Sequence, residues 1–289
     1  MSFRLGCAIW AYKEWVGEQS GSLFPAGSRA PDFLHLYSRR FSTVEGNTTF
    51  YSIPDAPTVQ RWVAETPASF KFCLKLPRSI THQGLLTPAI SQAIAFLQQM
   101  QGLGDRLGIF FIQLPPSYGP EQWADLSSFL TALPHEKFQF ALEVRHRDWF
   151  VEPHAHQLNA LLTDLSMGRV LLDTRPIYDC PDDPQLASER KKPRVPLQPI
   201  ITANFSLIRY ISHPDLDWNQ RYFMEWTKQI SLWLQQGIHI YFFVHCPIEV
   251  HSPRNARALQ TLLEAQGAAV PPLPWNMLEP PPTQLSLFE

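Results

Sequence analysis

The sequence predicts an α/β fold: a (β/α)8 TIM-type barrel with an irregular unit after strand six and a Pro-rich C-terminal tail. Eight short apolar segments alternate with longer segments of helical periodicity. Several of the short segments are apolar throughout, as expected of parallel strands with both faces buried. The chain has 289 residues, of which 45% are hydrophobic. A single barrel of this type needs roughly 250 residues, so one barrel accounts for most of the chain.

Strands are expected where apolar runs end at polar or turn-forming residues. In chain order they span residues 3–9, 42–47, 70–76, 107–114, 138–144, 169–173, 205–211 and 239–245. Helices are expected where apolar residues recur every three to four positions. In chain order they span residues 30–41, 58–65, 88–101, 120–133, 152–165, 217–236 and 252–265. Pro57 and Pro120 begin two of these helices, Gly102 and Gly237 end two others, and Ser252 is the expected N-cap of the last.

One unit of the barrel is irregular, because the chain between Asp173 and Phe205 is Pro-rich and has no helical pattern. A connection this long is uncommon unless it is functional or disordered. It carries the basic run Arg190, Lys191, Lys192 and Arg194. Such a run is usually part of a solvated loop; contact with phosphate groups is the alternative, because the loop follows a strand at the barrel mouth.

The chain divides into a barrel over residues 1–269, a Pro-rich linker over 270–283 and a terminal peptide over 284–289. Its 24 Lys and Arg nearly balance 26 Asp and Glu, which excludes a global field that would draw it to nucleic acid or an anionic membrane. The four cysteines form no CxxC pair. We see no signal peptide and no apolar run of about 18 residues, so we expect a cytoplasmic protein without membrane contact.

Polar residues follow the apolar strands and converge at the barrel mouth, where TIM barrels carry their chemistry. The candidate catalytic residues are Glu45 or Glu143 as a general base and His245 as an acid/base. The candidate substrate-binding residues are Trp10, Asn47, Lys75, Arg78, Gln113, Arg145, Asp173 and Arg209. Among these, Lys75, Arg78 and Arg145 form a clamp for an anion such as phosphate. The alternative is a structural network in which Glu143 and Arg145 pair and order the rim.

The sequence leaves the cofactor unknown. Glu45, Glu143, Asp173 and His245 have side chains that suit a divalent metal. They come from separate strands, however, and no motif such as HExxH or a Gly-rich phosphate loop is present.

Several blocks of the sequence together resemble the YecE-like family, known as domain of unknown function 72. The blocks begin at Trp10-Ala11-Tyr12-Lys13-Glu14-Trp15, Val44-Glu45-Gly46-Asn47-Thr48-Thr49, Phe70-Lys71-Phe72, Pro77-Arg78, Gln113-Leu114-Pro115-Pro116 and Glu143-Val144-Arg145-His146. The resemblance covers about the first 270 residues. It implies a TIM-type barrel and supplies no reaction. Two places depart from the commoner family pattern: Tyr210-Ile211-Ser212 follows Arg209 where Arg-x-His-Gly is usual, and Val244-His245 replaces an Asn pair.

The C-terminal peptide resembles the pentapeptide by which bacterial replication and repair proteins bind the DNA polymerase sliding clamp. Its residues are Gln284, Leu285, Ser286, Leu287 and Phe288. Leu287 and Phe288 would fill an apolar cleft, Leu285 would add apolar contact and Gln284 would hydrogen-bond at the edge. The alternative is that these residues fold back over an apolar patch of the barrel.

Three functions fit these observations. The first is a clamp-tethered barrel that processes nucleic acid in replication or repair, as a hydrolase of phosphodiester or other phosphate-bearing substrates. The second is a non-enzymatic, clamp-associated adaptor. The third is an enzyme acting on a small molecule such as a phosphorylated sugar, with an incidental tail. A clamp-tethered protein needs little DNA affinity of its own, because tethering raises the effective concentration.

Overall fold

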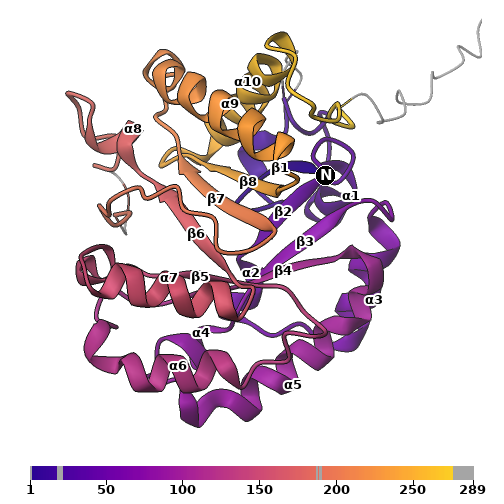
Figure 1. The fold of residues 1–289 in the computed structure, drawn as a ribbon. Helices are drawn as coiled ribbons and strands as arrows, with labels where there is room; N and C mark the ends of the chain where they lie inside the picture. The colour runs from indigo at the N-terminus through magenta and orange to yellow at the C-terminus, as the bar shows by residue number, and fades with distance from the viewer. Residues whose placement is uncertain (1, 18–21, 187, 189–190, 276–289) are drawn as a thin grey trace, which may run out of the picture.

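The computed structural model describes residues 2–17, 22–186, 188 and 191–275. It confirms the predicted barrel: eight parallel strands follow one another in the order β1-β8-β7-β6-β5-β4-β3-β2, and helices surround them (Figure 1). The strands are β1 (Phe3–Cys7), β2 (Thr43–Gly46), β3 (Lys71–Lys75), β4 (Leu107–Gln113), β5 (Phe140–Glu143), β6 (Gly168–Asp173), β7 (Phe205–Ile211) and β8 (His239–His245).

The helices lie outside the strands and follow them in sequence. They are α1 (Phe33–Tyr37), α2 (Thr48–Tyr51), α3 (Ala56–Glu65), α4 (Arg78–Thr81), α5 (Ile90–Met100), α6 (Trp123–Thr131), α7 (His154–Asp164), α8 (Arg175–Tyr178), α9 (Gln220–Gln235) and α10 (Ser252–Ala265). Among the described helices, none has the length and apolar character needed to cross a bilayer.

The helix predicted over residues 30–41 is shorter in the structure. A 3-10 turn, Ala30–Asp32, precedes α1, which ends at Tyr37. Pro31 near the start of the turn fixes φ and lacks an N–H. The unit after β6 is irregular, as predicted: the four-residue helix α8 is its helical part, and a coil reaches from there to β7 across the described residues.

The barrel closes between β1 and β2 through a few hydrogen bonds, in which the Tyr37 side chain bridges the two strands. The Tyr37 hydroxyl accepts a hydrogen bond from the N–H of Cys7 (2.6 Å) and donates one to the carbonyl of Thr43 (3.1 Å). The Ser42 N–H donates to the carbonyl of Leu5 (3.2 Å). Tyr37 is fully buried, so its hydroxyl substitutes for part of a strand ladder where both backbone groups are cut off from water.

Alternation along the strands sorts their side chains into two cores. Those pointing outward pack beneath the helices in one large cluster. Those pointing inward fill the barrel with an apolar plug: Cys73, Ile109, Phe111, Ala141, Val170, Phe205, Leu207, Tyr241 and Phe243. Because the period along a strand is two residues, the next inward position on each strand lies one layer nearer the mouth. That layer is polar, and it forms the floor of the candidate site.

The end of the described chain packs at the opposite end of the barrel. The Trp275 ring contacts Phe41 (centroids 5.4 Å apart) and lies beneath the guanidinium of Arg257 (4.8 Å). Pro271 and Pro272 line a cavity together with Phe3. The predicted terminal peptide, residues 284–289, lies outside the described residues, as do residues 276–283 of the predicted linker.

Candidate active site

Six polar side chains point inward at the carboxyl ends of six strands. They are Glu45, Lys75, Gln113, Glu143, Arg209 and His245. Each is at most 6% exposed. Each lies two residues beyond an inward-pointing residue of its own strand, as Arg209 does after Leu207 and His245 after Phe243. The sequence-predicted residues of these strands therefore meet in one layer.

Arg209 holds both carboxylates of this layer. Its Nε and Nη2 donate to the two oxygens of Glu45 at 2.7 and 2.9 Å, and its Nη1 donates to Glu143 Oε2 at 2.5 Å. Glu45 also accepts from Asn47 Nδ2 (2.8 Å) and from His245 Nε2 (2.8 Å). The network thus fixes five predicted residues from four strands, Glu143 among them, around one guanidinium.

The same network decides the charges of its members. Burial alone would raise the pKa of a carboxyl, but Arg209 and Arg145 lower the pKa of Glu143 to about 2. Arg209 and His245 hold the pKa of Glu45 well below its usual value. Burial lowers the pKa of His245 to about 4, against the opposing effect of Glu45. Near neutral pH the two carboxylates are therefore ionised and saturated with donors, and His245 is neutral with its proton on Nε2 toward Glu45.

A cavity of about 390 Å³ opens above this layer. Its lining includes the cationic side chains Lys75, Arg78, Arg145, Lys191, Lys192 and Arg209. The other lining residues are Ile9, Asn47, Phe50, Tyr51, His82, Gln113 and Pro193, with no acidic residue among them. The two carboxylates lie beneath and offset the charges of Arg209 and Arg145, so Arg78, Lys191 and Lys192 supply the remaining positive charge of the cavity.

Lys75 lies at the floor of this cavity. Its Nζ donates to Gln113 Oε1 (2.7 Å), which also accepts from Arg145 Nη2 (2.7 Å). The ring of Phe50 lies 3.8 Å from Nζ. Burial, together with the charge of Arg209, lowers the pKa of Lys75 from 10.5 to about 7. The amine is therefore largely uncharged slightly above neutral pH.

Phe50 and His82 line the cavity but were not among the predicted site residues. Phe50 lies in α2, directly after β2, and His82 follows α4, directly after β3. Their rings meet edge to face (5.0 Å) beside Lys75. Burial and the nearby cations Lys75 and Arg145 lower the pKa of His82 to about 4. The available signal was position, because residues just after a barrel strand face the mouth.

The irregular connection after β6 brings part of the predicted basic run to the mouth. Lys191 and Lys192 both line the cavity. The connection is fastened by Tyr178, whose hydroxyl donates to the Lys192 carbonyl, and by Asp183, which pairs with Lys191 (2.7 Å). Arg194 instead lies over the Tyr178 ring (5.4 Å). The long connection therefore supplies the cationic wall opposite α2 and α4.

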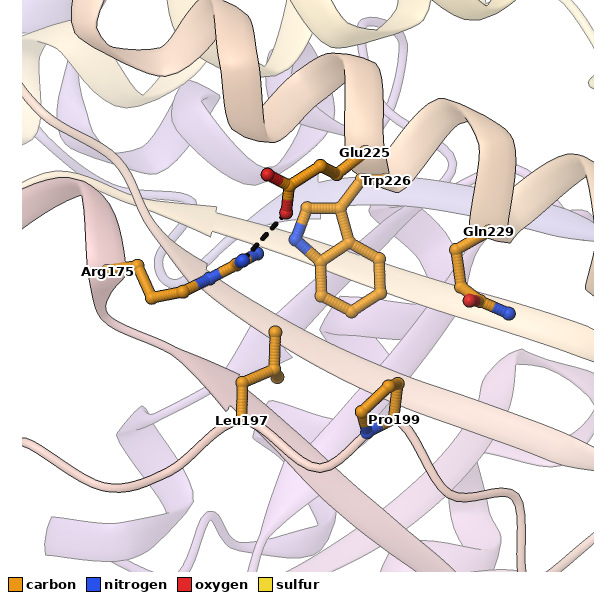
Figure 2. Close-up of a pocket in the computed structure, with 6 residues that line it drawn as sticks. All are labelled: Arg175, Leu197, Pro199, Glu225, Trp226 and Gln229. Atoms are coloured by element: carbon orange, nitrogen blue, oxygen red, sulfur yellow. Dashed lines mark hydrogen bonds and ion pairs between the residues drawn. The ribbon is translucent and has the colours of Figure 1, made fainter.

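Asp173 lies apart from this cavity, although it ends β6. Val170 and Leu172 occupy the inward positions, so Asp173 points outward. It accepts from Arg175 Nε (2.9 Å) and from Trp226 Nε1 (2.9 Å). Figure 2 shows the second cavity that these partners line, where Arg175 also pairs with Glu225 (2.7 Å). Asp173 is thus a buried anchor for α8 and α9.

Trp10 also lies outside the residues that line the mouth cavity. Its ring packs edge to face against Trp62 of α3 (5.2 Å) and Phe72 of β3 (6.1 Å). Both partners belong to the outer core. Trp10 therefore joins the end of β1 to the helical layer.

The donor set does not favour a metal at the mouth, because the oxygens of Glu45 and Glu143 are occupied by Arg209 and its neighbours. In the described part of the chain, Cys180, Asp182 and His213 do bring three ligand atoms within 4.8 Å of one another. However, His213 Nδ1 accepts from the Asp215 N–H (2.9 Å), so the ring proton is on Nε2, facing Asp182 (3.1 Å). A protonated Nε2 has no lone pair for an ion.

Comparison with known proteins identifies the family. A family model described as "Protein of unknown function DUF72" matches residues 4–278. The chain belongs to the DUF72 family. UPF0759 protein YecE of Escherichia coli strain K12 is 34% identical over 278 residues, which are 93% of this chain and 97% of that protein. UPF0759 protein YunF of Bacillus subtilis is 30% identical over 148 residues, 47% of this chain and 50% of that protein.

Crystal structures of DUF72 proteins share the fold. A DUF72 protein from Enterococcus faecalis V583 superposes with a TM-score of 0.67 at 20% identity, covering 91% of this chain and 98% of that one. One from Thermotoga maritima MSB8 gives a TM-score of 0.68 at 17% identity, covering 91% and 100%. These likenesses show the barrel and assign no reaction. Function must therefore be argued from the mouth of this DUF72 barrel.

Proposed function

We propose that the barrel mouth binds a phosphate-bearing small ligand. The observation that carries the proposal is the cavity of about 390 Å³ whose charged lining residues are all cationic. Its volume lies at the lower end of the range for small-molecule sites, about 300–1,000 Å³. One sugar phosphate or one nucleotide has this size. A nucleic-acid substrate would have to enter as a strand end or as a flipped nucleotide.

The arrangement of the cations supports phosphate over a simple carboxylate. Arg78 offers a planar fork of N–H donors, and Arg145 adds its charge, although its Nε and Nη2 already donate to Glu143 and Gln113. Lys191 and Lys192 add point charges from the opposite wall. A phosphate has more acceptor oxygens than a carboxylate and can accept from several sides at once. The floor is held rigid by the Arg209 network, so little reorganisation opposes binding.

The test is calorimetric titration with ribose 5-phosphate and, separately, ribose. We expect the phosphate to bind at least tenfold more tightly, with an affinity that falls as salt is raised. Arg78→Gln should weaken the phosphate about tenfold, since Arg78 is exposed and its loss leaves the buried network intact. Arg61→Gln, on the outer helix α3, is the matched control. Equal binding of the two sugars would contradict the proposal.

A second proposed function concerns the tail: residues 284–288 bind a bacterial DNA polymerase sliding clamp. The Gln-Leu-Ser-Leu-Phe sequence supports it, and so does its position after a Pro-rich stretch. Trp275 lies at the end of the barrel opposite the mouth. A clamp held by the tail would therefore leave the mouth free for nucleic acid, and it would place the protein in the cytoplasm in replication or repair.

Binding to a purified bacterial clamp tests this second function. We expect micromolar or tighter binding by the full chain and none by a truncation that ends at Thr283. Leu287→Ala combined with Phe288→Ala should abolish binding, whereas Glu289→Ala should preserve it. Equal binding by the truncated chain would exclude the tail as the binding element. A non-enzymatic adaptor would keep its cellular function in Glu143→Gln, whereas an enzyme that depends on the mouth would lose it.

A further inference from the structure

The nitrogen of Lys75 is surrounded as a neutral amine would be. Lys75 is 6% exposed, and Gln113 Oε1 is the one hydrogen-bond acceptor it meets among the described residues. The ring faces of Phe50 (3.8 Å) and Phe111 (5.7 Å) occupy two other sides, where they attract a positive charge but accept no full hydrogen bond. A buried ammonium has three N–H donors to satisfy, whereas an amine has two and keeps a lone pair. A single acceptor therefore suits the neutral amine better than the ammonium.

The nearby cations act in the same direction as burial and against the carboxylates of Glu45 and Glu143. Arg209 and Arg145 disfavour a further positive charge, and Arg209 is itself fixed by two carboxylates. Together with burial they bring the pKa of Lys75 to about 7. Desolvation and a neighbouring cation are the two means by which proteins turn a lysine into a nucleophile at neutral pH.

We propose that Lys75 forms a Schiff base with the carbonyl carbon of a phosphorylated aldose or ketose. This inference rests on the proposed function, because the cationic wall would hold the phosphate while Lys75 at the floor meets the carbonyl. The amine lone pair forms the C–N bond, and the carbonyl oxygen takes up a proton. That oxygen then leaves as water when C=N forms. Overall, amine, carbonyl and one proton from solvent give an iminium ion and water.

The residues beside Lys75 suit such an adduct. Gln113 Oε1 can retain its hydrogen bond to the remaining N–H, and the face of Phe50 can lie against the iminium cation. The carboxylates of Glu45 and Glu143, which favour a positive charge on Lys75, would stabilise the iminium as well. The carbonyl can come from a free sugar phosphate or from the ring-opened deoxyribose of an abasic DNA site, which carry the same aldehyde and phosphate groups.

The experiment is reductive trapping of the full chain with cyanoborohydride and peptide mass spectrometry. Glyceraldehyde 3-phosphate probes the free source and an abasic oligonucleotide probes the DNA source. With at least one of them we expect an adduct on Lys75, formed at least tenfold faster than on the exposed Lys228 of α9. Lys75→Arg should abolish this adduct, and Lys228→Arg should leave it unchanged. The trapping rate should rise to a plateau with a midpoint near pH 7, whereas exposed lysines gain reactivity up to about pH 10.

Two outcomes separate this inference from the proposed function. Glycerol 3-phosphate has the phosphate and no carbonyl, so it should compete with trapping if the mouth binds phosphate. If glycerol 3-phosphate binds but no probe traps on Lys75, the Schiff base is wrong and the phosphate site stands. If Lys75 traps glyceraldehyde as fast as its phosphate and glycerol 3-phosphate does not compete, the phosphate site is wrong and the reactive lysine stands. Labelling spread over lysines according to their exposure would overturn the inference.

Discussion

Replacing Arg209 with Met should reverse the way in which the stability of this barrel depends on pH. Arg209 is 3% exposed and is the common partner of two carboxylates that are themselves at most 1% exposed. Its removal leaves Glu45 with Asn47 and His245, and Glu143 with Arg145. Breaking one buried ion pair costs about 3–5 kcal/mol, and the remaining partners keep the loss within that range.

The pKa of Glu143 sets an upper bound on its share of this effect, because Arg145 and Lys75 lower that pKa together with Arg209. In the wild type the pKa of Glu143 falls from 4.5 to about 2, which corresponds to about 3 kcal/mol of stabilisation above pH 4.5. This contribution is lost as pH falls through about 2. In the variant, burial without Arg209 raises the pKa of both carboxyls above the unfolded value. The folded variant then binds more protons than its unfolded chain, so its stability increases as pH falls from 8 to 5.

Urea unfolding at pH 5, 6, 7 and 8, followed by the fluorescence of the nine tryptophans, measures this directly. We expect a deficit of about 3–5 kcal/mol at pH 8 that shrinks toward pH 5. Adding Glu143→Gln to the variant should recover part of the deficit at pH 8. Arg61→Met, which breaks an exposed pair with Glu65 (3.8 Å), should cost less than about 1 kcal/mol at every pH. A deficit independent of pH would refute the assignment of buried, ionised carboxylates.

Three other substitutions test separate parts of the structure. Tyr37→Phe should lower the free energy of unfolding in urea by about 2–4 kcal/mol and speed hydrogen exchange at the Cys7 amide, because the N–H of Cys7 and the carbonyl of Thr43 lose their buried partner. An unchanged free energy of unfolding would show that the Tyr37 hydroxyl does not help to close the barrel. Glu249→Gln should leave the free energy of unfolding at pH 4 nearly unchanged and raise it above pH 8 by at least ~1 kcal/mol. Burial raises the pKa of Glu249 to about 8, so at higher pH the ionisation of this carboxyl opposes folding. Equal effects of the substitution at both pH values would contradict this. Lys75→Met should stabilise the protein by about 2–5 kcal/mol below pH 7, and this gain should fall toward pH 10. Below pH 7 the folded protein holds Lys75 as a buried ammonium, which is the form that burial destabilises. A lower Tm of the variant than of the wild type at pH 6 would show that the buried charge is not destabilising.

The sequence predicted the fold because each barrel unit carries its own local signal. The predicted segments 205–211, 239–245 and 252–265 coincide with β7, β8 and α10. Each combines a continuous apolar run, or helical periodicity, with a clear breaker at its end. The helix expected over 30–41 was too long, because a 3-10 turn that contains Pro31 precedes α1 and α1 ends at Tyr37.

Side-chain direction was harder to predict than strand position. In a parallel strand that is buried on both faces, such as β6, the apolar residues Val170, Leu171 and Leu172 follow one another without the alternation that would show which residue faces inward. Glu143 and Asp173 both end apolar strands, yet one joins the Arg209 network and the other anchors Arg175 and Trp226 outside the barrel. The two residues differ in which face of their strand they occupy, and residue type does not show this. His82 follows β3 closely enough to be expected at the mouth, but its place beside Lys75 depends on the short helix α4.

The mouth therefore combines two environments that serve different purposes. The Arg209 network fixes two carboxylates with so many donors that neither is suited to accept a proton near neutral pH. Its charge also lowers the pKa of Lys75, so the same guanidinium both stabilises the floor and activates the amine. The acid/base roles expected for Glu45, Glu143 and His245 thus give way to a proposal centred on Lys75. Because Lys75 stays buried in Arg209→Met, that variant should raise the Lys75 pKa only in part, and trapping at pH 7 should slow even where the variant remains folded.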